Sequence, residues 1–323
     1  MPPAAFTHLN HYVPPVADGL SDAWRRVLAR LGDDTATVVQ IVGLRPVAVR
    51  LHAQTERHIL IRITTLNEHL ILRVAPEDDL AAHVFFLRTA GGQGLPVPRL
   101  IQRDLARTMV PFAYTLEAYV PGVGADQLTE THLLRGAGRQ AGRALRRMHR
   151  VRAPGAGRPN PNGRWPSQGW LAALNRIGNY LAPPPTDAVL FDETIQARIA
   201  CVLSDPRLYM SVPQLIHGDF GPHAVCCTAG SHVNLEALVE PGICVGGDGL
   251  FDLACGLCAI YPEPWREGLL DGYTSAGPLS DEEQIRLPLL RLLTSYWLAC
   301  RRYSLGLPHE AARHEALERL ATL

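Results

Sequence analysis

The sequence predicts a bilobal α+β fold, with a small β-rich lobe over residues 1–120 and a larger, mainly helical lobe over residues 121–323. Three observations support this class. Short alternating or β-branched runs are concentrated before residue 120, Pro121-Gly122 interrupts the chain where they end, and long amphipathic runs dominate afterwards. A chain of 323 residues is long enough to bury two cores. Small ligands usually bind in clefts between such lobes.

The first lobe is predicted to carry helices beside an antiparallel sheet. Apolar residues have helical spacing over residues 21–31, with Ser21 or Asp22 as a cap, and again over residues 79–89. Gly94-Leu-Pro-Val-Pro98 breaks the second of these helices. Between and after them the pattern alternates, which is typical of strands. We expect strands at residues 38–42, 47–51, 59–64, 70–74, 99–104 and 114–119.

The second lobe is predicted to be helical, with one short β-containing insertion. An amphipathic, arginine-rich helix is expected over residues 132–151, and the Pro- and Gly-rich residues 153–167 should form a loop. A strand–loop–strand region is expected at 214–245. Further helices are expected at 170–181, at 194–203 and from residue 250 to the end.

Composition restricts the classes of partner. The 31 basic and 31 acidic residues balance, so charge gives no reason to expect nucleic acid or an anionic membrane. No apolar run approaches the length of a membrane span, and residues 1–20 contain no hydrophobic segment of the kind found in secretion signals. An odd number of cysteines, seven, suits a reducing compartment, so we expect a cytoplasmic protein. The sequence leaves the oligomeric state open.

Residues 215–225 contain the most informative motif. An apolar strand ends in His217-Gly218-Asp219, and a Gly/Pro loop follows. About twenty residues later come Glu240-Pro-Gly242 and then Gly246-Gly-Asp-Gly-Leu-Phe-Asp-Leu-Ala254. This ordered pair of blocks resembles the catalytic and metal-binding blocks of the aminoglycoside phosphotransferase/choline kinase-like family. Four further segments match the family in the same order, namely residues 70–74, 94–98, 117–122 and 145–149, so the resemblance runs from about residue 38 to the end.

The resemblance implies a protein-kinase-like fold and transfer of the ATP γ-phosphate to a hydroxyl of a small molecule, with Mg²⁺ as the second cofactor. Asp248 and Asp252 are expected to anchor the loop and a helix N-terminus. The other roles are carried over one residue at a time: Asp219 as catalytic base, His217 as support for the catalytic loop, Arg73 facing the phosphates, the backbone of Glu117, Ala118 and Tyr119 receiving adenine, and Glu240 binding the metal.

Four departures from the family pattern lie on the nucleotide and metal side. Ala224 stands at the metal-binding asparagine, and Glu240 at the metal-binding aspartate. Mg²⁺ prefers oxygen ligands in near-octahedral geometry, so both changes weaken its predicted site. His83 stands where a helix glutamate should pair with Arg73, which predicts that this ion pair is missing. Residues 53–58 replace a glycine-bearing phosphate loop and contain no glycine.

Three functions are therefore compatible with the sequence. The first is an ATP-dependent small-molecule kinase with Asp219 as base. The second is an ATP-independent enzyme of isomerase, cyclase or lyase type that uses Asp219, with His223 nearby, as a general acid or base. The third is a non-catalytic pseudokinase that binds a small molecule or a protein. The substrate is not identified by any motif.

Overall fold

The computed structural model describes residues 6–14 and 20–323, which fall into two compact units. Unit 1 comprises Met1–Arg88, Pro98–Val120 and Asn160–Gly163, and unit 2 comprises Thr89–Val97, Pro121–Pro159 and Arg164–Leu323. Unit 1 contains a five-stranded antiparallel sheet, and unit 2 is mainly helical. The predicted α+β class is confirmed.

The sheet of unit 1 has the strand order β1-β2-β3-β5-β4, and every neighbouring pair is antiparallel. On β3, Arg73 lies opposite Thr115 of β5, so Glu117, two residues further along β5, shares its face of the sheet. The register therefore places a cation and a carboxylate diagonally across two central strands. The strands are β1 Ala48–Gln54, β2 Ile59–Thr64, β3 His69–Ala75, β4 Leu100–Asp104 and β5 Ala113–Ala118.

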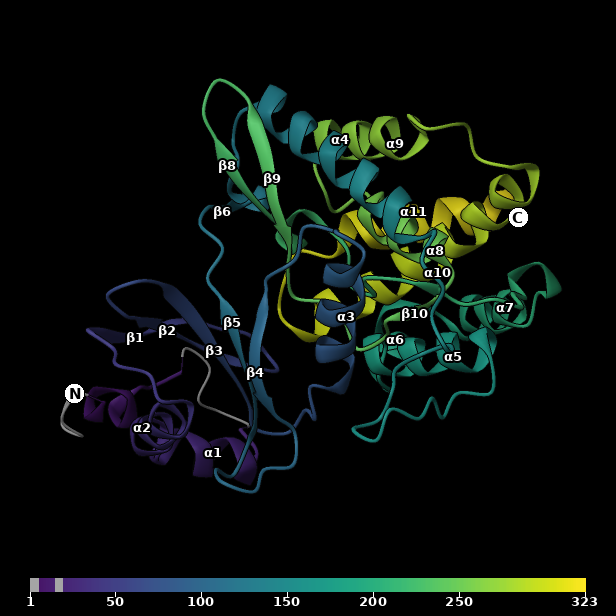
Figure 1. Ribbon diagram of the computed structural model, residues 1–323. Helices are drawn as coiled ribbons and strands as arrows, with labels where there is room; N and C mark the ends of the chain where they lie inside the picture. Colours follow the sequence, from purple (N-terminus) through teal and green to yellow (C-terminus); the bar gives the residue numbers. More distant parts are fainter. Residues whose placement is uncertain (1–5, 15–19) are drawn as a thin grey trace. The chain divides into compact units, whose positions relative to one another are not determined.

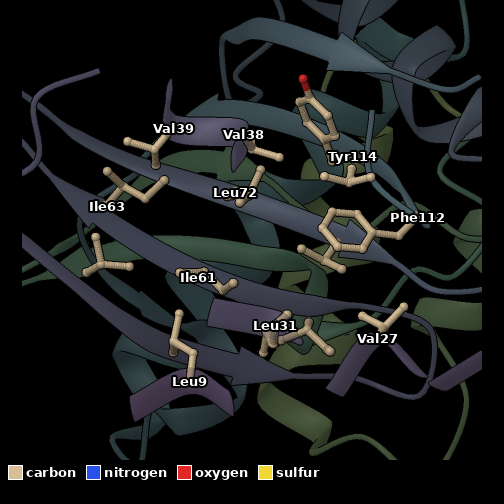
Figure 2. Close-up of a cluster of buried hydrophobic side chains, with 14 of the residues drawn as sticks. Leu9, Val27, Leu31, Val38, Val39, Ile61, Ile63, Leu72, Phe112 and Tyr114 are labelled. Atoms are coloured by element: carbon tan, nitrogen blue, oxygen red, sulfur yellow. The ribbon is translucent and has the colours of Figure 1, made fainter. Parts of the chain in front are cut away.

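The opposite face of this sheet is covered by the N-terminal helices α1 (Asp22–Ala29) and α2 (Leu31–Val42) and the 3-10 turn η2 (Thr7–His11) (Figure 1). Figure 2 shows side chains from these helices, such as Leu31 and Val38, against strand residues such as Ile61. Burial of this apolar surface is the main stabilising contribution in unit 1.

The strand predicted at residues 38–42 is wrong, because these residues form the C-terminal half of α2. Val38 and Val39 are buried against the sheet, and Asp33 and Asp34 lie in the first turn, where carboxylates favour a helix. Gly43 ends the helix in the left-handed conformation, with φ of 74°. Tertiary packing thus outweighs the β propensity of the valines.

The remaining elements follow the predicted organisation. Residues 153–167 contain no helix or strand beyond isolated bridges, as expected of a loop. Among the described residues 6–14 and 20–323, no helix combines the length and apolar character needed to cross a bilayer. The elements are α3 Ala81–Gly92, β6 Val123–Gly124, η3 Ala125–Gln127, α4 Thr131–Met148, α5 Trp170–Leu181, α6 Thr186–Leu190, α7 Glu193–Leu203, η4 Pro206–Leu208, β7 Gln214–Leu215, η5 Pro222–Ala224, β8 Val225–Ala229, β9 Val233–Leu238, β10 Gly246–Gly247, α8 Gly249–Gly256, α9 Glu263–Thr274, α10 Asp281–Ser304 and α11 Glu310–Thr322.

Within unit 2, helices α4 and α9 approach each other closely through glycines (Figure 1). A Cβ on Gly142 would lie 2.2 Å from the carbonyl oxygen of Leu269, and one on Gly272 would lie 2.0 Å from that of Arg139. Only glycine allows this approach. The contact brings His149, at the end of α4, to Tyr273 of α9, and both residues support the candidate site described next.

Candidate active site

A buried aspartate fixes the backbone of the predicted catalytic loop. Asp252, on helix α8, is fully buried, and its Oδ2 accepts hydrogen bonds from the amide of His217 at 2.6 Å and from Nε2 of His149 at 3.1 Å. Its Oδ1 accepts from the amide of Gly218 at 2.8 Å. The His149 ring also contacts the Tyr273 hydroxyl through Nδ1, at 2.9 Å. Asp252 therefore anchors the loop, as its sequence position suggests.

The turn before Asp219 is packed too tightly to accept any residue except glycine. Gly218 has φ of 80°, and a Cβ there would lie 1.9 Å from the carbonyl oxygen of Cys244. The amide of Gly242 donates to the carbonyl of His217 at 2.8 Å. Together with Asp252, these contacts hold the backbone that leads to Asp219 from both sides.

His217 is buried and ties this loop to the segment before Glu240. Its Nε2 lies 2.8 Å from the carbonyl oxygen of Val239. Burial lowers the pKa of His217, and the attraction of Asp252 opposes this effect without overcoming it. A neutral ring that donates to a backbone carbonyl suits a supporting role better than direct contact with substrate.

Asp219 is the exposed member of this loop. Its side chain is 55% exposed, and its Oδ1 lies 3.7 Å from Nε2 of His223, which is 39% exposed. Burial works against the imidazolium form of His223, but the nearby carboxylate of Asp219, with the charges of Asp126 and Glu240, outweighs it and raises the pKa of His223. A carboxylate and an imidazole in this arrangement can accept and donate protons.

Two acidic residues lie near His223, and the sequence predicted a role for only one of them. Glu240 was a predicted metal ligand, and the structure places its charge near His223. It occupies the left-handed region with φ of 55°, which is strained for a glutamate. Asp126, in η3, was not predicted, because it lies about ninety residues before Asp219 and belongs to no recognised motif.

Tyr261 is a second feature that the sequence did not reveal. A Cβ on Gly221 would lie 2.4 Å from the Tyr261 hydroxyl oxygen, and the Tyr261 and His223 ring centroids are 6.3 Å apart. Burial raises the pKa of Tyr261, and the charge of Asp219 raises it further. Tyr261 therefore remains a neutral hydroxyl beside the Asp219 loop.

The predicted Mg²⁺ site lacks one of its two expected side-chain ligands. Ala224 is fully buried in η5 and offers a methyl group where the family pattern has an asparagine. Within the described ranges 6–14 and 20–323, no three His, Cys, Asp or Glu side chains are grouped so that they could hold a metal ion. The residues present do not fit the two-ligand Mg²⁺ site that the resemblance implies.

In unit 1, Arg73 has a carboxylate partner on strand β5, which the sequence did not predict. Arg73 Nε lies 3.1 Å from Glu117 Oε1, and the same oxygen lies 2.7 Å from Nε2 of His83 on α3. The carboxylate that should come from the helix comes instead from strand β5, and the helix contributes a histidine. All three side chains are at least 95% buried. Burial alone would raise the pKa of Glu117, but Arg73 and His83 hold it well below its usual range.

The turn between β1 and β2 joins the same network. Arg73 Nη1 lies 3.2 Å from His58 Nδ1, and the other ring nitrogen of His58 lies 3.5 Å from a carboxylate oxygen of Asp78. Arg57 Nη1 lies 3.6 Å from the same Asp78 oxygen. Residues 53–58, which contain no glycine, therefore direct the side chains of Arg57 and His58 toward Asp78 of the same unit.

The predicted adenine-binding backbone is partly occupied. The amide of Ala118 donates to the carbonyl of Arg99, and the amide of Tyr119 donates to that of His69, both at 2.9 Å. The Tyr119 ring lies under the guanidinium of Arg62, 3.9 Å from its centroid. An adenine that bonded to either amide would have to displace a carbonyl oxygen.

Comparison with known families assigns the chain to a class. Residues 49–287 match the model of the phosphotransferase enzyme family, APH, and this span covers well over half of the chain. The chain therefore belongs to the APH phosphotransferase family, as the ordered motifs predicted. Comparison with the curated proteins gives no significant match.

Solved structures show the same fold. A thermostable mutant of aminoglycoside phosphotransferase APH(4)-Ia, in ternary complex with ADP and hygromycin B, is 16% identical with a TM-score of 0.66, covering 88% of this chain and 96% of its own. A protein described as a fructosamine-3-kinase from Haemophilus somnus 129PT is 14% identical with a TM-score of 0.59, covering 89% and 95%. The GDP and kanamycin complex of APH(2")-IIIa gives 13% and 0.56, covering 89% and 97%. At these identities the likeness confirms the protein-kinase-like fold alone.

Proposed function

We propose that this protein transfers the γ-phosphate of ATP to a hydroxyl group of a small molecule, with Asp219 as proton acceptor. The position of Asp219 carries the proposal: its carboxylate is half exposed, whereas the backbone before it is held by buried groups. A general base needs both access to substrate and a fixed position. Membership of the APH family supports the choice of phosphoryl transfer.

Arg73 would hold the nucleotide phosphates. In kinases, a strand cation that pairs with a carboxylate positions the phosphates, and the pair formed by Arg73 and Glu117 supplies that arrangement with the carboxylate on β5. His83 provides a further contact to Glu117 and so helps to fix Arg73 through it. When bound, ATP supplies the phosphoryl group.

The loss of the asparagine at position 224 does not exclude nucleotide binding. Two thermostable APH(4)-Ia mutants, each with one asparagine changed to alanine, form ternary complexes with AMP-PNP and hygromycin B. In one of them the altered asparagine lies five positions after an aspartate that another mutant replaces. Ala224 lies five positions after Asp219. We assign no step to Mg²⁺, because Glu240 and Ala224 do not form its expected pair of ligands.

In the proposed reaction, the substrate hydroxyl donates its proton to the Asp219 carboxylate. The freed oxygen forms a bond to the γ-phosphorus while the bond from that phosphorus to the β-phosphate oxygen breaks, and ADP leaves with the electron pair. His223 lies 3.7 Å from the Asp219 carboxylate, which raises the pKa of His223, so the imidazole is placed to stabilise negative charge beside the reacting hydroxyl.

A second candidate is ATP-independent acid–base catalysis by Asp219 and His223 on a small organic substrate. The buried methyl of Ala224 and the paired amides of Ala118 and Tyr119 favour it, because both changes remove nucleotide or metal contacts. In this case Asp219 would still exchange a proton with substrate, but Arg73 would serve only to stabilise unit 1.

Nucleotide binding separates the two candidates. Isothermal titration with AMP-PNP, with Mg²⁺ and with EDTA, should show binding in both conditions if phosphoryl transfer is the function. A radiolabelled γ-phosphate transfer screen against hydroxylated amines, sugars and macrolides should then find an acceptor. No binding in either condition, together with no transfer, would contradict the first proposal and leave the second.

A further inference from the structure

Unit 2 contains a cavity that shares no residue with the Asp219 loop. It has a volume of about 420 Å³. No acidic side chain contributes to its lining, and three of the six lining residues are arginines. We call it the arginine cavity, and its lining residues are Gln93, Leu95, Arg147, Arg150, Val151 and Arg152.

Two groups of arginines lie on helix α4 and just beyond its end. Those that face α9 and α10 are paired: Arg139 lies 3.3 Å from Asp271, and Arg146 lies 2.6 Å from Glu283. In contrast, the arginines of the cavity form no ion pair with any residue of the described ranges. A cluster of cations without acidic neighbours costs free energy through mutual repulsion unless an anion joins it.

Hydrogen bonds fix the backbone that carries these arginines, whose side chains are exposed. Arg147 Nη2 donates to the carbonyl of Gly94 at 3.3 Å. The amide of Val151 donates to Met148 at 2.9 Å, and its carbonyl accepts from Leu215 at 2.7 Å. Arg152 forms a β-bridge with Gln214. A fixed backbone reduces the entropy lost when a ligand binds, so that the remaining cost lies in ordering the arginine side chains.

The end of helix α4 explains only part of this charge. A helix C-terminus carries about half a negative charge, which a single arginine is sufficient to balance. Arg147 lies in the last turn, but Arg150 and Arg152 lie beyond the helix end at Met148. The cavity therefore has more positive charge than the helix can compensate.

We propose that the arginine cavity binds a small molecule that carries at least two phosphate groups, with Arg147, Arg150 and Arg152 as its ligands. Each guanidinium presents a planar fork that matches two phosphate oxygens, and three forks exceed what one carboxylate can use. The apolar Leu95 side chain lies buried at the cavity wall and can pack against the uncharged part of such a ligand.

Titration of the full-length protein with inorganic pyrophosphate tests this site. The wild type should bind, and the Arg147→Gln/Arg150→Gln double variant should bind at least about tenfold more weakly, because each change removes charged hydrogen bonds. Arg143→Gln is the matched control: Arg143 is exposed on the same helix, outside the cavity, and should leave the affinity unchanged. Citrate, a tricarboxylate, should bind more weakly than pyrophosphate.

The same titration distinguishes this inference from the proposed function. Asp219→Asn, which lacks the proposed base, should bind pyrophosphate as tightly as the wild type. The inference is overturned if the wild type does not bind at millimolar pyrophosphate, if the double variant binds equally well, if Arg143→Gln is equally weakened, or if citrate binds more tightly.

Discussion

The two candidate regions use charge in opposite ways. In unit 1, Arg73, Glu117 and His83 are all buried, and the Glu117 carboxylate contacts both of the other side chains. In unit 2, Asp252 is buried beneath the loop, while Asp219 and His223 at its surface remain accessible. Unit 1 departs from the family pattern at single positions, and the carboxylate that pairs with Arg73 comes from strand β5 instead of from the helix. In unit 2, Asp252 holds the loop that carries the predicted catalytic Asp219, but Ala224 stands where the family pattern has a metal-binding asparagine.

The difference shows which parts of a site can be rearranged. A carboxylate can move from helix to strand if the register brings it to the same place, because an ion pair depends on distance and burial. The Asp219 turn depends on backbone geometry, with Gly218 in a conformation that other residues rarely adopt. At this turn the sequence matches the family pattern. Both regions can be tested by single substitutions.

The largest effect on stability should follow Glu117→Gln. This change leaves the buried Arg73 without its carboxylate, which costs about 3 kcal/mol or more of unfolding free energy. Urea denaturation at neutral pH measures it. Glu68→Gln, which removes only an exposed pair with Arg99 at 3.7 Å, should change stability by less than about 1 kcal/mol. If both variants lose equally little, the buried network does not stabilise unit 1.

A smaller loss, about 2 kcal/mol, is expected for Asp252→Asn. The carboxylate accepts from two loop amides and from His149, and an asparagine has only one acceptor oxygen to serve them. Asp271→Asn, which weakens surface pairs with Arg135 and Arg139 in the same unit, is the control and should cost little. If Asp252→Asn is as stable as the control, the hydrogen bonds of Asp252 do not stabilise the backbone of the Asp219 loop.

The smallest effect concerns pH. Because burial lowers the pKa of His217, the folded protein keeps this ring neutral while the unfolded chain takes up a proton below about pH 6.5. The contribution of the neutral His217 ring to the free energy of unfolding is therefore complete above about pH 6.5. It falls on acidification by at most about 1.4 kcal/mol for each pH unit.

The measurement compares urea denaturation of the wild type and of His217→Gln at about pH 7.5 and about pH 5.5. The variant, which has no ring to protonate, should lose less stability on acidification than the wild type. Equal losses would contradict a neutral, buried His217.

Local sequence patterns predicted the sheet of unit 1, most helices and the Asp219 loop, because alternation, helical spacing and glycine turns are local signals. The error at residues 38–42 arose because packing against the sheet outweighed the β propensity of Val38 and Val39. The pair formed by Arg73 and Glu117 could not be predicted, because it joins residues 44 positions apart through strand register. Asp126 and Tyr261 reach the site only through tertiary packing, and neither belongs to a motif.

The account depends most on the role of Asp219, and single-turnover phosphoryl transfer by the wild type and by Asp219→Asn, with an acceptor found by screening, tests it most directly. Asp219 is half exposed, so the variant should unfold at the same urea concentration as the wild type. Its transfer rate should nevertheless fall by at least about a hundredfold. A variant that transfers phosphate at the wild-type rate would contradict the account.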